Sequence, residues 1–293
     1  MPSGTDPAAA EDASVTILAP AKLNLNLRIT GRRADGYHLL DSVVVFTAFG
    51  DSLTLHERTG ATDDSFTVSG PFASAVPHAA VDNLCLRAMQ TFREAGGICG
   101  PLDIHLDKQI PAGAGLGGGS SDAAAILRQL NRTSPAPLTG TRLAELALSL
   151  GADVPVCLAG GAQRMTGIGE RLEAITPLPT GHVVLARPDI MLPTAQVFAG
   201  LTPSGAPHPA SSHTGGDVRA LIAIGNDLSA PAMQLAPPIA TLLDAIGDCE
   251  RCLAAQMSGS GSACFGLFPD QASTQMTAGT LRAAGYWAVA TRF

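Results

Sequence analysis

The chain has 293 residues, a length typical of two domains, and 46% of them are hydrophobic, which allows a packed core and excludes an intrinsically disordered chain. Eighteen Lys and Arg against 25 Asp and Glu give a net charge of −7, which argues against broad binding to nucleic acid or anionic membranes. No apolar run approaches the roughly 18 residues of a membrane span. Met1–Asp12 lacks the basic and apolar regions of a secretory signal, so we expect an unstructured tail there and a cytoplasmic protein.

The first periodic segment, Lys22–Ile29, alternates strictly between apolar and polar residues. This period of two predicts a strand with one buried face. The polar face carries Lys22, Asn24 and Asn26, and two interpretations of it stay open: exposure to solvent, which the pattern alone favours, and the lining of a cleft. A turn is predicted at Arg33–Gly36, where Asp-Gly is a hairpin signal.

The rest of the chain interleaves strands and helices. Further strands are predicted at Val43–Phe49, Asp51–His56, Phe66–Ser69, Leu102–Leu106, near Ala255, near Ala263 and at Trp287–Thr291. Helices are predicted at Asn83–Glu94, from Ser120 onward, and at Thr141–Leu150, Val218–Ile224, Pro237–Ile246 and Gln271–Ala284. The early hairpins do not fit a doubly wound parallel sheet, so we expect an α+β fold with two domains, residues 1–176 and 177–293. Pro203–Asp217 has no periodicity and is predicted to be a surface loop.

A glycine-rich segment, Pro111–Ser121, lies between a predicted strand and a predicted helix. Glycines let backbone N–H groups approach a phosphate, and a helix N-terminus adds unpaired N–H groups and a partial positive charge. Ser120, Ser121 and Asp122 are predicted to cap the helix, and the two hydroxyls are available to a phosphate or to magnesium. The segment therefore indicates an anion-binding loop.

The spacing of the loop residues leaves three other interpretations to consider. Gly113, Gly115 and Gly118 satisfy G-x-G-x-x-G, but a dinucleotide site also needs an acidic residue about 20 positions on, and 128–138 contains none. A Walker loop needs a lysine before the serine, and Ser120 directly follows a glycine. A flexible linker fits poorly, because a strand and a helix bound the segment tightly. Spacing favours phosphate binding and weakens the alternatives without removing them.

Five motifs occur in an order that is typical of one group of enzymes. They are Ala19–Asn24, Arg33–His38, Pro111–Ser121, Gly151–Pro155 and Met257–Ala263. With these motifs the chain resembles the GHMP kinase superfamily. Within it the chain is most similar to the branch that phosphorylates 4-diphosphocytidyl-2-C-methyl-D-erythritol in non-mevalonate isoprenoid biosynthesis.

The resemblance implies an N-terminal domain of the ribosomal-protein-S5 type and a ferredoxin-like C-terminal domain, with the active site between them. It implies transfer of the ATP γ-phosphoryl group to the 2-hydroxyl of the methylerythritol unit, with Mg²⁺ as a cofactor. In such relatives two residues are catalytic, and they correspond here to Lys22 and Asp153. The chemistry agrees, because a carboxylate can accept the proton of the attacking hydroxyl and an ammonium group can stabilise the developing negative charge.

The resemblance also implies binding residues. For the nucleotide these are Asn83, near the adenine, and the whole loop: Pro111, Ala112, Gly113, Ala114, Gly115, Leu116, Gly117, Gly118, Gly119, Ser120 and Ser121. For the substrate they are Asn24, Tyr37, His38, Thr194 and Phe198, with Tyr37 and Phe198 stacking on the cytosine and His38 hydrogen-bonding to it. Val44 stands where some relatives place a phenylalanine, which implies a different wall of the cytosine pocket. No magnesium ligand is assigned.

Two functional alternatives remain. One is another GHMP kinase of the homoserine or mevalonate type, and the Tyr37–His38 pair argues against it because neither substrate carries a base. The other is a non-catalytic nucleotide-binding protein, against which the presence of both Lys22 and Asp153 argues. We expect a small-molecule substrate, no nucleic-acid or membrane partner, and either a monomer or a weak homodimer.

Overall fold

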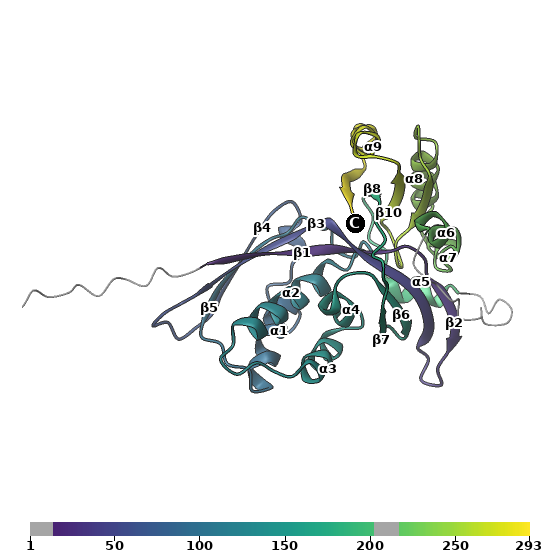
Figure 1. Cartoon of the computed structure of the whole chain (residues 1–293). Coiled ribbons are helices and arrows are strands. Elements are labelled where there is room, and N and C mark those ends of the chain that lie inside the picture. The colour runs from purple at the N-terminus through teal and green to yellow at the C-terminus, as the bar shows by residue number, and fades with distance from the viewer. Residues whose placement is uncertain (1–13, 202–216) are drawn as a thin grey trace, which may run out of the picture.

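The computed structural model describes residues 14–201 and 217–293, and the predicted tail and most of the predicted loop at 203–217 lie outside these residues. The described strands form two sheets (Figure 1). The first sheet has seven strands: β1 (Val15–Asn24), β2 (Arg28–Arg32), β3 (His38–Glu57), β4 (Ser65–Ser69), β5 (Leu102–Asp107), β6 (Gln163–Gly167) and β7 (Arg171–Ala174). The second has four, in the order β11-β8-β10-β9: β8 (His182–Arg187), β9 (Ala254–Met257), β10 (Cys264–Phe268) and β11 (Trp287–Arg292).

The long strand β3 organises the first sheet. It pairs antiparallel with β1, β2, β5 and β6, and only β4 and β5 pair in parallel. The two strands predicted at 43–49 and 51–56 are parts of this one strand. The glycine between them, Gly50, lies opposite Pro20 of β1, where the strands are so close that a Cβ on Gly50 would be 2.7 Å from the Cα of Pro20. Glycine inside a strand can mark such a close approach rather than an end.

The first predicted strand, Lys22–Ile29, is divided in the structure. β1 ends at Asn24 and begins earlier than predicted, and β2 begins at Arg28. Lys22, Asn24 and Asn26 are 4%, 1% and 0% exposed, so the solvent-exposed interpretation of the polar face is wrong. Asn26 has a structural role, because its Oδ1 accepts a hydrogen bond of 2.8 Å from the backbone N–H of Val43.

Four α-helices lie on one side of the first sheet and five belong to the second half of the described chain (Figure 1). The first set is α1 (Leu84–Glu94), α2 (Gly118–Thr133), α3 (Gly140–Leu150) and α4 (Val154–Ala159). The second set is α5 (Thr194–Ala199), α6 (Val218–Ala223), α7 (Ser229–Leu235), α8 (Pro238–Gly247) and α9 (Gln271–Ala283). Helix α2 packs against β1 and β3, while α1 and α4 pack against α2. No helix among the described residues is both long and apolar enough to cross a membrane.

The two sheets share a hydrophobic core. Leu23 and Val43 of the first sheet pack in one cluster with Val183 and Phe265 of the second. The chain passes from the first sheet to the second between β7, which ends at Ala174, and β8, which begins at His182. This interval contains the predicted division between residues 176 and 177, which stays a prediction. The mixed α+β architecture agrees with the predicted fold class.

Candidate active site

A cavity of about 550 Å³, the phosphate-loop cavity, lies beside the glycine-rich loop. Most of the predicted catalytic and binding residues line it: Lys22, Asn24, Asn83, Pro111, Ala112, Gly113, Ala114, Gly115, Gly117, Gly118, Gly119, Ser120, Asp153, Thr194 and Phe198. A neighbouring cavity of about 900 Å³, the acceptor cavity, is lined by Tyr37 and His38. Thr194 and Phe198 line both cavities, so the two form one continuous site.

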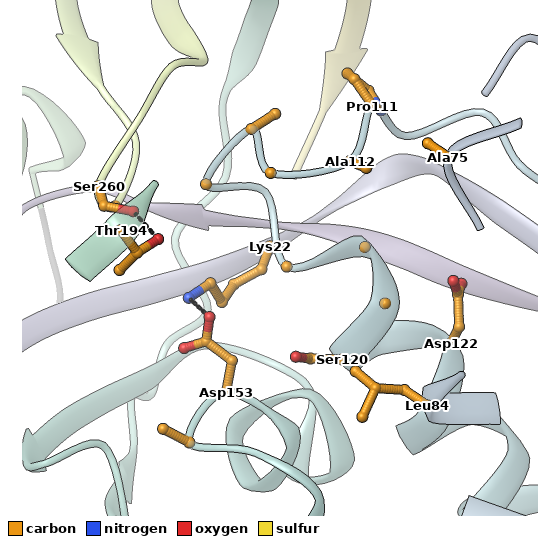
Figure 2. A pocket seen from close by; sticks show the side chains of 18 of the residues that line it. Lys22, Ala75, Leu84, Pro111, Ala112, Ser120, Asp122, Asp153, Thr194 and Ser260 are labelled. Carbon is orange, nitrogen blue, oxygen red and sulfur yellow. Dashed lines mark hydrogen bonds and ion pairs between the residues drawn. The ribbon is translucent and has the colours of Figure 1, made fainter. Parts of the chain in front are cut away.

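The two predicted catalytic side chains contact each other. The Nζ atom of Lys22 lies 2.7 Å from Oδ2 of Asp153, as Figure 2 shows. The lysine side chain is 5% exposed, and the aspartate, at the start of α4, is 40% exposed. The backbone N–H of Lys22 donates a 2.8 Å hydrogen bond to the carbonyl of Leu116, which ties β1 to the loop. In this arrangement the accessible carboxylate can accept a proton, and the buried ammonium group can stabilise negative charge on a nearby phosphate.

The loop adopts its shape because three glycines take left-handed conformations. Gly113, Gly115 and Gly117 have φ angles of 62°, 75° and 67°, which residues with a Cβ rarely adopt. Gly117 is the N-cap residue, so α2 begins at Gly118, earlier than predicted. The predicted capping role of Ser120, Ser121 and Asp122 is therefore wrong, because all three already lie within the helix.

Not every loop residue faces the cavity. Ser120 lines the phosphate-loop cavity, whereas Leu116 and Ser121 are 1% and 2% exposed and do not line it. We expect the latter two to support the loop from below. The backbone N–H of Ser121 donates to the carbonyl of Gly117, which leaves the N–H groups before it free of such a helical bond.

The last of the five motifs, Met257–Ala263, supports the loop from the second sheet. The N–H of Ala263 donates to the carbonyl of Ala114 at 2.9 Å, and the hydroxyl of Ser258 donates to the carbonyl of Gly115 at 3.2 Å. A Cβ on Gly115 would lie 2.5 Å from the carbonyl oxygen of Ser258. Ser260 of the same motif is hydrogen-bonded to Thr194 at 2.8 Å (Figure 2). The fold thus joins two motifs that are far apart in sequence.

Asn24 carries an oxygen atom that the protein leaves unsatisfied. Its Nδ2 donates to the hydroxyl of Ser42 at 2.8 Å, and its backbone N–H donates to Ser258. Its Oδ1 is buried and has no hydrogen-bond partner among the described residues. An unpaired buried acceptor costs about 1–3 kcal/mol, and this one belongs to a residue that lines the phosphate-loop cavity.

The acceptor cavity contains a pair of rings. The rings of His38 and Phe198 lie 5.3 Å apart between centroids, with an interplanar angle of 32°. Tyr37 is 61% exposed at the mouth. Partial burial, and secondarily the positive charge of Arg32, lowers the pKa of His38, which keeps its imidazole neutral at pH 7. A neutral imidazole and flat apolar rings suit a planar base.

Two predicted residues have other surroundings than expected. Asn83 is the N-cap of α1: its Oδ1 accepts from the N–H groups of Cys85 and Leu86, and its Nδ2 donates to the carbonyl of Pro77 at 2.9 Å. It lines the phosphate-loop cavity, but capping occupies most of its amide. Val44 is fully buried in the hydrophobic cluster between the first sheet and its helices. It lines neither cavity, so the structure does not support its predicted place in a pocket wall.

Sequence reasoning missed a buried charged cluster under the loop, formed by Asp51, Lys108 and Asp122. The only available signal was the presence of charged residues directly beside the loop. For a cation, the described residues contain no group of three metal-ligating side chains. The cavity does offer the Ser120 hydroxyl, a single oxygen donor that fits a Mg²⁺ ion held mainly by nucleotide phosphates.

The fold and this site define a class, and comparison with known families agrees. The model of the GHMP kinases N terminal domain matches residues 83–161, and the model of the GHMP kinases C terminal domain matches residues 210–279. A homoserine kinase from Cytophaga hutchinsonii, 18% identical, superimposes with a TM-score of 0.70 over 99% of this chain and 96% of its own, which shows the shared fold. The chain has the GHMP kinase fold.

Closer relatives narrow the class. A 4-diphosphocytidyl-2-C-methyl-D-erythritol kinase from Paramagnetospirillum magneticum is 44% identical over 275 residues, which cover 92% of this chain and 95% of the relative. A crystal structure of 4-(cytidine 5'-diphospho)-2C-methyl-D-erythritol kinase is 34% identical, with a TM-score of 0.76, over 95% of this chain and 98% of that one. The chain belongs to the 4-diphosphocytidyl-2-C-methyl-D-erythritol kinase family. The resemblance inferred from the motifs is confirmed.

Proposed function

We propose that the chain transfers the γ-phosphoryl group of ATP to the 2-hydroxyl of 4-diphosphocytidyl-2-C-methyl-D-erythritol. The observation that carries this proposal is the Lys22–Asp153 pair in the wall of the phosphate-loop cavity, where that cavity continues into one with a base-stacking pair. The first cavity suits a nucleoside triphosphate and the second suits a cytidyl group. Membership of the family supports the same reaction.

In the proposed mechanism, the cytosine of the acceptor packs against Tyr37 and Phe198, and the neutral His38 hydrogen-bonds to it. This places the methylerythritol hydroxyl toward Asp153. The carboxylate accepts the hydroxyl proton while the oxygen forms a bond to the γ-phosphorus, and the bond from that phosphorus to the β-phosphate oxygen breaks to release ADP. Lys22 stabilises the negative charge that builds on the transferred group.

The glycine-rich loop and the N-terminus of α2 hold the triphosphate through backbone N–H groups. The unpaired Oδ1 of Asn24 accepts a hydrogen bond from the acceptor. Mg²⁺, when bound with ATP, neutralises charge on the phosphates. Ser120, which lines the phosphate-loop cavity, is the side chain that we propose as its protein partner. A cytoplasmic location stays a prediction from the sequence.

The test is ADP release from the purified chain with ATP, Mg²⁺ and each of three alcohols: the cytidyl methylerythritol, homoserine and mevalonate. We expect turnover with the first only. Turnover with homoserine or mevalonate alone would replace the proposed substrate. ATP binding without turnover on any of the three would favour a non-catalytic nucleotide-binding protein. The control is Asp153→Asn, which retains ATP binding and removes the proton acceptor.

A further inference from the structure

Three ionisable side chains are buried together beneath the phosphate loop. Asp51 comes from β3, Lys108 follows β5, and Asp122 lies in the first turns of α2. The Nζ atom of Lys108 is 2.6 Å from Oδ2 of Asp51 and 2.6 Å from Oδ2 of Asp122. The three side chains are between 0% and 5% exposed. Lysine and aspartate are seldom buried this deeply without a specific reason.

Asp51 also binds the backbone on the other side of the cluster. Its Oδ1 accepts hydrogen bonds from the N–H of Gln109 at 2.6 Å and from the N–H of Ile110 at 2.7 Å. These are the last two residues before the loop begins at Pro111. One carboxylate therefore holds the entry of the loop directly and, through Lys108, holds the helix at its exit.

We propose that Asp51 is a positioning residue that, with Lys108 as the bridge, fixes both ends of the phosphate loop in the conformation that binds ATP. Lys108 and Asp122 line the phosphate-loop cavity, whereas Asp51 lines neither cavity, so Asp51 acts through the loop and not by contact with the nucleotide. The inference rests on the proposed function only for the identity of the nucleotide.

Stability alone is a weak explanation for the cluster. Removing charges from water is costly, and well-packed apolar side chains of similar volume often serve a fold equally well. The cost is visible at Asp122: burial, and then the negative charge of Asp51, raise the pKa of this carboxyl to about 8 although Lys108 opposes the shift. Its second oxygen has no partner among the described residues. Apolar residues could not supply the directed hydrogen bonds to Gln109 and Ile110.

The nearby glycines show why the loop needs such a restraint. Left-handed glycines are permissive, so the free loop samples many conformations and ordering it on binding costs affinity. The cluster touches the loop closely, since a Cβ on Gly118 would lie 3.0 Å from Nζ of Lys108. Fixing both ends before ATP arrives removes part of that cost, and its loss would appear as weaker ATP binding with unchanged acceptor binding.

The test is Asp51→Asn in the full chain, which keeps the shape and one acceptor oxygen but removes the charge that holds Lys108. We expect the Kd of MgATP, measured by calorimetry without acceptor, and the KM for ATP to rise about tenfold, the size of one charge-assisted hydrogen bond. The KM for the acceptor should change less than about threefold on the same scale. Calorimetric binding of MgATP needs no turnover, so failure of the proposed acceptor would leave this test intact.

The matched control is Asp41→Asn. Asp41 is on the same strand, is 2% exposed, pairs with Arg164 at 2.9 Å and lines neither cavity. Both variants should lower Tm, and only Asp51→Asn should weaken MgATP binding. Equal losses of Tm with unchanged MgATP affinity in both variants would overturn the proposal and leave the cluster a merely structural role.

A second pair of variants keeps the inference testable where Asp51→Asn does not fold. Lys108→Met removes the bridge, and Lys108→Arg retains a cation that can contact both carboxylates. We expect MgATP affinity to fall in Lys108→Met and to be restored, at least in part, in Lys108→Arg. Equal affinities in these two variants would contradict the bridging role.

Discussion

The phosphate-loop cavity and the acceptor cavity hold their polar groups in different ways. In the first, Lys22 and Asn24 are 4% and 1% exposed and each is fixed by contacts with other segments. In the second, Tyr37 is 61% exposed and the defining contact is between two rings, His38 and Phe198. The chemical step depends on placing the reacting groups accurately, and contacts with buried neighbours fix them: Asp153, itself 40% exposed, is held by the buried Lys22. Recognition of a base by stacking tolerates looser walls.

This comparison leads to an ordered set of expectations. Substitutions in the phosphate-loop cavity should change kcat or ATP binding strongly. Substitutions in the acceptor cavity should change the KM for the acceptor alone, with little effect on stability.

The largest effect is expected for Asp153→Asn. An amide cannot accept the hydroxyl proton, so we expect kcat to fall by about 10²- to 10⁴-fold, the usual contribution of a general base. The Kd of MgATP should be unchanged, because the triphosphate is held by the loop. Steady-state kinetics and calorimetry measure the two quantities. A kcat within a few-fold of the wild type would remove Asp153 from the role of base.

Lys22→Met should follow, with kcat lower by about 10²- to 10³-fold, the range seen when one group that stabilises transition-state charge is removed. Because Lys22 and Asp153 are in contact at 2.7 Å, the double variant should lose much less than the product of the two single losses. Single-turnover kinetics on the three variants measures this coupling. Fully multiplicative losses would show that the two side chains act independently.

A smaller effect is expected for Tyr37→Ala. Loss of a stacking ring is worth about 0.5–1.5 kcal/mol, so the KM for the cytidyl acceptor should rise roughly two- to tenfold with kcat unchanged. Tm should stay the same because the side chain is 61% exposed. Tyr37→Phe is the control and should retain the wild-type KM. An unchanged KM in Tyr37→Ala would exclude stacking on the cytosine.

The smallest effect is a pH dependence of acceptor binding. Partial burial, and then the charge of Arg32, lowers the pKa of His38 below 6.5, so the imidazole stays neutral to a lower pH than a free histidine. The KM for the acceptor should therefore be flat above pH 6.5 and rise as the pH falls through the lowered pKa and the ring gains a proton. Kinetics between pH 5 and 8 measures the profile. The same rise in His38→Asn would assign it to another group.

Local signals predicted several elements well. α1 ends at Glu94, as predicted, and α3 ends at Leu150, before Gly151. Both helices have an apolar face at helical spacing and a capping residue at the start. These signals lie within a short stretch of sequence, so they can be recognised without the tertiary structure. The short helix α4 was not predicted, because its few residues show no period. β3 was predicted as two separate strands. The glycine between them, Gly50, is required by the close approach of Pro20 on β1, which only the tertiary structure shows.

The sequence by itself determined which chemistry is present, because the loop glycines, Lys22 and Asp153 belong to motifs whose spacing is local. Only the tertiary structure decided where these groups lie. It buried the polar face of β1, placed Asp153 at 2.7 Å from Lys22, and joined Asp51, Lys108 and Asp122 beneath the loop. The reason is physical: the alternation of a strand reports that one face differs from the other, whereas burial and pairing depend on segments distant in sequence that pack against it.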